Sequence, residues 1–99
     1  MDHPDLADVP LTDVLSALSD PVRLGIVRMA ADAPEPLPCR AFTDAILKST
    51  ASHHWRVLRE AGLIRQEPFG TSLLNRLRRD ELEVRFPGLL DAVLSTPQD

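Results

Sequence analysis

The 99-residue sequence contains a single cysteine, Cys39, and no tyrosine. One cysteine excludes an intrachain disulfide framework, and it excludes a zinc site built only from cysteines of one chain. No apolar run approaches the roughly 18–20 residues that are needed to cross a bilayer. The acidic start, residues 1–5, lacks the basic residues that open a signal peptide. We therefore expect a cytoplasmic protein that makes no contact with a membrane.

Signatures of catalysis are also missing, since the sequence has no glycine-rich phosphate loop and no nucleophile elbow. Ser52 lies beside His53 and His54, which invites a hydrolase interpretation. Adjacent residues of a helix point about 100° apart, however, and a catalytic triad needs a carboxylate that orients the imidazole. We expect neither an enzyme nor a cofactor.

The positive charges are concentrated in one part of the chain. The whole sequence has a formal charge of −4, but residues 48–79 hold seven basic and two acidic residues. That block carries +5, and the remainder carries −9. A polyanion responds to the local field rather than to the total charge. The block is therefore a candidate surface for nucleic acid in an otherwise acidic protein.

The length and composition fit one domain, with 43% apolar and 26% charged residues. Residues 1–10, rich in aspartate and proline, are predicted to be a flexible acidic tail, residues 11–95 a single domain, and residues 96–99 a second tail. A chain of this size buries only about two-thirds of its unfolded surface, so self-association would stabilise it.

Apolar spacing of three and four residues predicts a helix over 11–18. A second helix is expected over 21–31, with Asp20 as its N-cap and Pro21 at its first position. Three prolines predict a loop over 32–38, and a short helix follows over 39–45.

The next helix is expected to run from Ser49 to Ala61, because Gly62 follows where a left-handed residue would end it. Two strands, 63–67 and 73–78, should pair as a hairpin across the loop 68–72. From Asp80 the pattern is helical again, with a break at Pro87. The expected fold is mainly α, with about five helices and a two-stranded β-hairpin.

The helix over 49–61 has two distinct faces. Ala51, Trp55 and Leu58 form a stripe with helical spacing that is expected to be buried. The opposite face carries hydroxyl, imidazole and guanidinium groups, at Thr50, Ser52, His53, Arg56 and Arg59. Arginine binds a guanine edge or a phosphate, and serine and threonine bind bases or backbone. The alternative is a solvated basic face without a ligand, and this helix alone leaves both interpretations open.

The hairpin favours the nucleic-acid interpretation, because Arg65, Arg76, Arg78 and Arg79 lie on or beside its strands. Its loop carries Phe69 rather than a basic residue. Phe69 is expected either to contact nucleic-acid sugars or to fold back onto the hairpin.

Two stretches of the sequence resemble a known family. Residues 18–24, with Asp20, Pro21 and Arg23, are similar to the start of the second helix in ArsR-type winged helix-turn-helix repressors. Residues 49–64 are similar to the recognition helix of that family and to its exit into the wing. The resemblance covers residues 11–94 and implies a homodimer that binds a palindromic operator in double-stranded DNA and is released by an inducer.

The resemblance also implies roles for individual residues. His54 is expected to pack and to bond backbone, with a phosphate contact as the alternative, and Arg23 to form a structural ion pair rather than to contact DNA. Trp55 departs from the smaller apolar residue that is usual in the family. The predicted DNA contacts are Lys48, Ser49, Thr50, Ser52, His53, Arg56, Arg59 and Arg76. The predicted dimer interface contains Leu11, Val14, Leu15, Phe86, Leu89, Leu90 and Val93.

Many members of that family sense metals, but the ligands for the family's sites are missing here. Cys39 has no second cysteine near it, and the stretch 86–94 contains no histidine and only Asp91. His3 and Cys39 are left as a distant intersubunit pair. Cys39 itself is either a small apolar filler or a redox-active thiol. We expect a repressor without a metal site, and the alternative function is a dimeric protein-interaction module with weak or no DNA binding.

Overall fold

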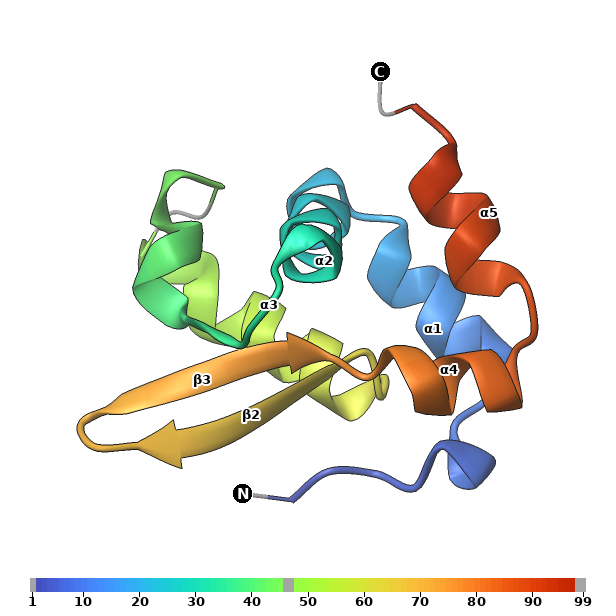
Figure 1. Ribbon diagram of the computed structural model, residues 1–99, viewed down its shortest axis with the longest axis horizontal. Coiled ribbons are helices and arrows are strands. Elements are labelled where there is room, and N and C mark those ends of the chain that lie inside the picture. The colour runs from blue at the N-terminus through green and yellow to red at the C-terminus, as the bar shows by residue number, and fades with distance from the viewer. Residues whose placement is uncertain (1, 46–47, 98–99) are drawn as a thin grey trace.

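The computed structural model describes residues 2–45 and 48–97, with the backbone alone for 43–45, 48 and 49. Helices and a small antiparallel sheet alternate along the chain, and the hairpin projects from the helices as a long arm (Figure 1). The α-helices are α1 (Leu11–Leu18), α2 (Pro21–Asp32), α3 (Lys48–Glu60), α4 (Arg79–Arg85) and α5 (Leu89–Ser95). The 3₁₀ helices are η1 (Leu6–Asp8) and η2 (Cys39–Ala45), and the strands are β1 (Leu37–Pro38), β2 (Ile64–Phe69) and β3 (Ser72–Leu77).

The start of α2 is set by Asp20, as the sequence predicts. Its carboxylate accepts hydrogen bonds from the backbone N–H groups of Val22 (2.9 Å) and Arg23 (3.0 Å), and Pro21 occupies the first turn. The Arg23 amide, followed by the Arg23 charge, lowers the pKa of the Asp20 carboxyl from its usual value. This cap fixes where α2 begins after the turn that follows α1.

The end of α3 is set by Gly62, which has a φ of 78°. The Gly62 and Leu63 amides donate to the carbonyls of Arg59 (3.1 Å) and Leu58 (3.0 Å), as in a Schellman cap. A Cβ atom at position 62 would also collide with the Leu6 side chain. The predicted glycine cap is therefore confirmed, and a contact with the N-terminal segment adds to the need for glycine.

The hairpin reverses direction at Gly70 and Thr71, so its strands extend further than the expected loop 68–72 allows. Pro68 lies on β2, where the missing amide is tolerated because β2 is an edge strand in the order β1–β3–β2. The expectation of a two-stranded sheet is incomplete: Leu37 and Pro38, expected in a loop, pair with Asn75 and Leu74 of β3.

Residues 2–10, whose composition predicts a flexible tail, lie against the domain instead. Leu6 and Val9 are each 4% exposed. The Arg78 guanidinium donates to the Pro4 carbonyl (2.9 Å), and that of Arg85 donates to the Leu6 carbonyl (3.0 Å). This segment, which we call the N-terminal strap, runs past the junction of α3 and β2 (Figure 1). The packed domain therefore includes residues before position 10, where the sequence predicted that it would begin.

The C-terminal helix breaks where Pro87 predicts it, and Gly88 adopts a φ of 80° between α4 and α5. Arg28 of α2 donates to the carbonyls of Leu94 (3.1 Å) and Val93 (3.2 Å), so that the end of α5 is tied to α2. Across residues 2–45 and 48–97, none of the helices has the length and apolar character of a membrane span.

Candidate nucleic-acid interface

The polar face of α3 is exposed, as the helical spacing predicts. Thr50, Ser52, His53 and Arg56 are all exposed on this helix. The backbones of Lys48 and Ser49 form its first turn, whereas their side chains lie outside the described part of the chain. These four of the predicted contacts on α3 therefore share one accessible surface.

The opposite face of α3 is anchored in the core. Trp55 is 8% exposed and Leu58 is fully buried. The Trp55 ring meets Phe42 of η2 edge to face, with the ring centroids 5.2 Å apart. The larger side chain at position 55 is thus accommodated by an aromatic pair, which fixes the rotation of α3 about its own axis.

A groove of about 660 Å³ separates the polar face of α3 from the β2–β3 hairpin, which we call the wing. Ser52, His53 and Arg56 line it from α3, and Leu73 and Gln66 line it from the hairpin. Ser52, His53 and Arg56 therefore border a concave surface whose other wall is the wing.

Arg59 does not share the exposure of its neighbours. Its Nη1 donates to Oε1 of Gln66 on β2 (2.9 Å), and the Gln66 amide donates to Oδ1 of Asn75 on β3 (2.7 Å). Gln66 and Asn75 are 2% and 1% exposed. Asn75 in turn donates to the Leu37 carbonyl (3.1 Å) and to Sγ of Cys39 (3.2 Å). This chain of side chains, which we call the Gln66–Asn75 chain, links α3 to all three strands and to η2.

Sequence reasoning missed the Gln66–Asn75 chain, because two amides within a strand pattern carry no signal that they face inward. Buried polar groups are stabilising only when they are hydrogen-bonded, and these partners are supplied by segments up to 38 residues away. Arg59, predicted to contact DNA, here has an intramolecular partner.

His3 of the N-terminal strap extends this network. Its Nε2 accepts a hydrogen bond from the Gln66 backbone N–H (2.9 Å), which requires a neutral imidazole with the proton on Nδ1. Burial, followed by the positive charges of Arg65, Arg78 and Arg59, lowers the pKa of His3 from its usual value of 6.5. Protonation would abolish the hydrogen bond and add a cation among arginines.

We predict that this histidine makes the fold sensitive to mild acid. Because its pKa is lower in the folded state, the unfolded chain binds the proton more readily. The stability that neutral His3 supplies is therefore complete above pH 6.5 and is lost as the pH falls from there toward the lowered pKa. Urea unfolding at about pH 5 and about pH 7.5 should show a smaller pH dependence for His3→Gln, which keeps an acceptor without a titrating group.

An unchanged pH dependence in His3→Gln would contradict this assignment. Two carboxyls with lowered pKa, Asp20 and Glu81, do not confuse the measurement. Their contributions are lost only as the pH falls below their ordinary values of 3.8 and 4.5.

The arginines of the wing are less available than the charge count implies. Arg78 is 4% exposed and its Nη2 lies 2.7 Å from the Glu81 carboxylate, which lowers the pKa of Glu81. Arg65 lies 3.8 Å from the same carboxylate, and Arg76 lies 3.4 Å from Glu67. Arg76 is nevertheless exposed and stays a predicted phosphate contact, whereas Arg78 is a structural residue.

Arg40 is a candidate contact that the sequence reasoning missed. It is exposed on η2 and its Nη1 donates to Oγ of Ser72 on the wing (3.4 Å). Arg40 is a basic residue that lies only eight residues before Lys48, where the basic block begins, and the block as defined does not include it. Phe69 at the wing tip is 70% exposed, so it does not fold back onto the hairpin.

His54 and Arg23 form a bridge between α3 and α2. Arg23 Nη1 lies 3.2 Å from His54 Nδ1, and Arg23 Nε donates to the Ala17 carbonyl (2.8 Å). A guanidinium only donates, so His54 Nδ1 is the acceptor in this contact. Arg23 is thus structural as expected, but its partners are the carbonyls of Ala17 and Ser16 and the His54 imidazole rather than a carboxylate.

Metal ligands do not converge in the described part of the chain, where no three His, Cys, Asp or Glu side chains are grouped to hold an ion. Within one chain, His3 and Cys39 both contact the Gln66–Asn75 chain instead. The two candidate ligands His3 and Cys39 therefore already have partners within the protein.

The residues predicted for the dimer interface fall into two groups. Val14, Phe86 and Leu90 are 0%, 8% and 3% exposed within the single chain, so these three side chains are covered without a partner. Leu11 and Leu15 are 45% and 46% exposed. Leu89 and Val93 are half-buried. Periodicity alone cannot separate a core position from an interface position on the same helix.

Taken together, a pair of helices with an exposed polar face on the second, followed by an antiparallel wing, defines a winged helix-turn-helix fold. A family profile described as a helix-turn-helix domain matches residues 18–67. The sequence is 34% identical over 82 residues to an uncharacterised HTH-type transcriptional regulator, YceK of Bacillus subtilis, covering 81% of this chain and 82% of YceK.

The fold is similar to that in the crystal structure of the transcriptional repressor BigR from Xylella fastidiosa. The TM-score is 0.63 with 21% sequence identity, over 89% of this chain and 88% of BigR. The chain belongs to the ArsR-like winged helix-turn-helix family of transcriptional regulators, a family of DNA-binding proteins and not of enzymes.

Proposed function

We propose that this protein is a homodimeric repressor that binds a palindromic operator through residues 49–61 and the wing, residues 63–78, without a metal-sensing site. The observation that carries the proposal is the exposed face of α3, with Thr50, Ser52, His53 and Arg56 beside the groove to the wing. An α-helix fits the major groove, where such side chains distinguish base pairs.

The Gln66–Asn75 chain supports this role because it fixes the geometry of the reading surface. Arg59 on α3 and Gln66 on β2 are joined at 2.9 Å, so that helix and wing meet the duplex as one body. Preorganised contacts lose less conformational entropy on binding than flexible ones. Arg76 and Arg40, both exposed beside the wing, are the side chains proposed to contact phosphates.

The proposed dimer places Leu11 and Leu15 of α1 against the partner chain. An apolar groove of about 490 Å³ lies beside Leu15 and is lined by Leu18, Leu24 and Val93 from three helices. Half-exposed leucines beside such a groove are typical of a surface that a partner covers. A twofold axis there would present two copies of α3 to successive major grooves, about 34–36 Å apart.

We predict that Leu15→Asp yields monomers with poor DNA binding, because each dimer would bury two charges without partners. Sedimentation velocity measures the oligomeric state. The matched control is Val84→Asp, since Val84 on α4 is 84% exposed and lies outside the proposed interface. A dimer that persists in Leu15→Asp, or a dimer lost equally in both variants, would place the interface elsewhere.

DNA binding itself is tested by sequencing the genomic fragments that the purified protein retains and titrating one of them at several salt concentrations. For an operator-binding dimer, log K should fall linearly with log salt, with a slope of about −0.9 for each phosphate neutralised. Absent or salt-insensitive binding would favour the alternative of a protein-interaction module. Chelators should leave the affinity unchanged, and release that depends on added metal would contradict the absence of a sensing site.

A further inference from the structure

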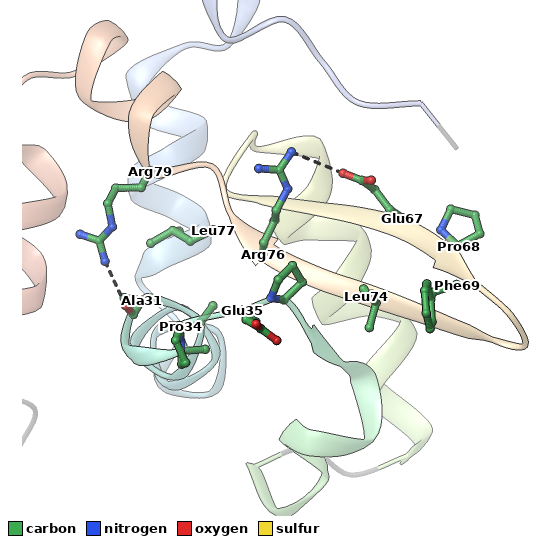
Figure 2. Close-up of a pocket in the computed structure, with 13 residues that line it drawn as sticks. Ala31, Pro34, Glu35, Glu67, Pro68, Phe69, Leu74, Arg76, Leu77 and Arg79 are labelled. Carbon is green, nitrogen blue, oxygen red and sulfur yellow. Dashed lines mark hydrogen bonds and ion pairs between the residues drawn. The ribbon is translucent and has the colours of Figure 1, made fainter.

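A second hollow lies on the other side of the wing, away from the groove beside α3. It has a volume of about 580 Å³ and is bounded by the end of α2, the loop over 33–36 and the β2–β3 hairpin (Figure 2). Small-molecule sites typically have volumes of about 300–1,000 Å³ and mostly apolar walls. None of the predicted contacts on α3 lines this hollow, which we call the wing pocket.

Prolines and other apolar residues line the wing pocket beside its charged residues. Pro34 and Pro36 form one side, and Pro68, Phe69 and Leu74 form the other. Proline fixes its own φ, so the pocket requires little ordering of these segments when a ligand enters. Figure 2 shows Phe69 and Leu74 on the wing across from Pro34, with Glu35 between them. Phe69 is 70% exposed and therefore offers an aromatic surface to a planar ligand.

In the described part of the chain, some of the charged side chains that line the wing pocket already have partners within the protein, and one does not. Arg76 is paired with Glu67 at 3.4 Å, and Arg79 donates to the Ala31 carbonyl at 3.1 Å, as the dashed lines of Figure 2 indicate. Among residues 2–45 and 48–97, no hydrogen bond or ion pair reaches the Glu35 carboxylate. The charge available to a ligand is thus a negative one, in a pocket that is also lined by an aromatic ring.

We propose that the wing pocket binds planar organic cations, with the aromatic body against Phe69 and Leu74 and the positive charge beside Glu35. A cation is attracted both by the carboxylate and by the face of an aromatic ring. An organic anion would meet Glu35 and would have to compete with Glu67 and the Ala31 carbonyl for the two arginines.

The test is an amide NMR titration of the wild-type protein with three bicyclic probes of similar size: N-methylquinolinium, 1-naphthalenemethanol and 1-naphthoate. N-methylquinolinium should bind most tightly and should shift the amides of Glu35, Phe69 and Leu74. Tighter binding of the naphthoate or of the neutral alcohol, or shifts confined to other parts of the chain, would overturn the proposal.

Two variants isolate the charge and the ring. Glu35→Lys should weaken N-methylquinolinium at least about fivefold and should make the naphthoate the better ligand. Asp91→Lys, the matched control, changes the net charge equally at a position that does not line the pocket and should leave the order unchanged. Phe69→Leu should weaken the cation about threefold while the neutral probe changes less. Equal effects of Glu35→Lys and Asp91→Lys would show that the preference reflects net charge, and the site would be rejected.

Discussion

Replacing Trp55 by alanine should lower the free energy of unfolding by about 3–5 kcal/mol, the usual cost of removing a large aromatic side chain from a core. Trp55 is 8% exposed and forms the edge-to-face pair with Phe42. Because a domain of this kind has a total stability of about 5–15 kcal/mol, this one substitution should remove a large share of it. Urea unfolding followed by far-UV circular dichroism measures the change, since the variant has lost the only tryptophan.

Trp55→Phe is the matched variant, because it keeps a ring for the contact with Phe42. It should lose clearly less stability than Trp55→Ala. If both variants unfolded at the wild-type urea concentration, the orientation of α3 would not depend on this aromatic pair. In that case the assignment of the inward and outward faces of α3 would also lose its support.

Arg56, the residue after Trp55, should affect DNA binding rather than stability. Arg56→Ala should weaken operator binding by about 1–3 kcal/mol, the range for an arginine that grips a base edge with two hydrogen bonds. The free energy of unfolding should change by no more than about 0.5 kcal/mol, because Arg56 is exposed. Fluorescence anisotropy with a genomic fragment retained by the wild type measures the affinity, and sedimentation confirms an unchanged oligomeric state.

Two further variants separate the contributions of charge and geometry at position 56. Arg56→Lys keeps the positive charge but loses the planar fork, and it should recover only part of the affinity. Arg79→Ala removes one positive charge at a position outside the reading face and should have a much smaller effect. Equal losses in Arg56→Ala and Arg79→Ala would mean that only the net charge of the chain matters.

Local signals in the sequence were sufficient for most helix boundaries. Asp20 and Pro21 start α2, and Gly62 ends α3. These caps can be predicted from the sequence because they bond backbone groups only a few residues away. The amphipathic pattern of α3 likewise predicted which side chains are exposed. These features depend on residues within about one turn of each other.

Contacts between distant segments account for the differences. The N-terminal strap is ordered by Arg78 and Arg85, which are more than 70 residues away from the carbonyls they bind. Leu6 and Val9 are too few to form a periodic pattern. The strand β1 contains only two residues and exists because β3 has an unpaired edge there. Composition alone therefore favoured a tail and a loop.

In the candidate site too, local features could be predicted from the sequence and contacts between distant segments could not. The exposure of Thr50, Ser52, His53 and Arg56 follows from helical spacing, whereas the partner of Arg59 depends on how the wing folds back onto α3. A count of basic residues could not reveal that Arg78 is buried beside Glu81. Charge patterns locate a surface, but pairing decides which of its charges are available.

The most direct test of DNA reading by α3 is methylation interference at guanine N7, which lies in the major groove. The protein should be bound to a genomic fragment that it retains, and the guanines whose methylation blocks binding should be mapped. We predict two clusters of interfering guanines whose centres lie about 10–10.5 base pairs apart, one for each copy of α3. Binding that is indifferent to N7 methylation throughout the fragment, or a single cluster without a symmetric counterpart, would contradict a twofold reader of the major groove.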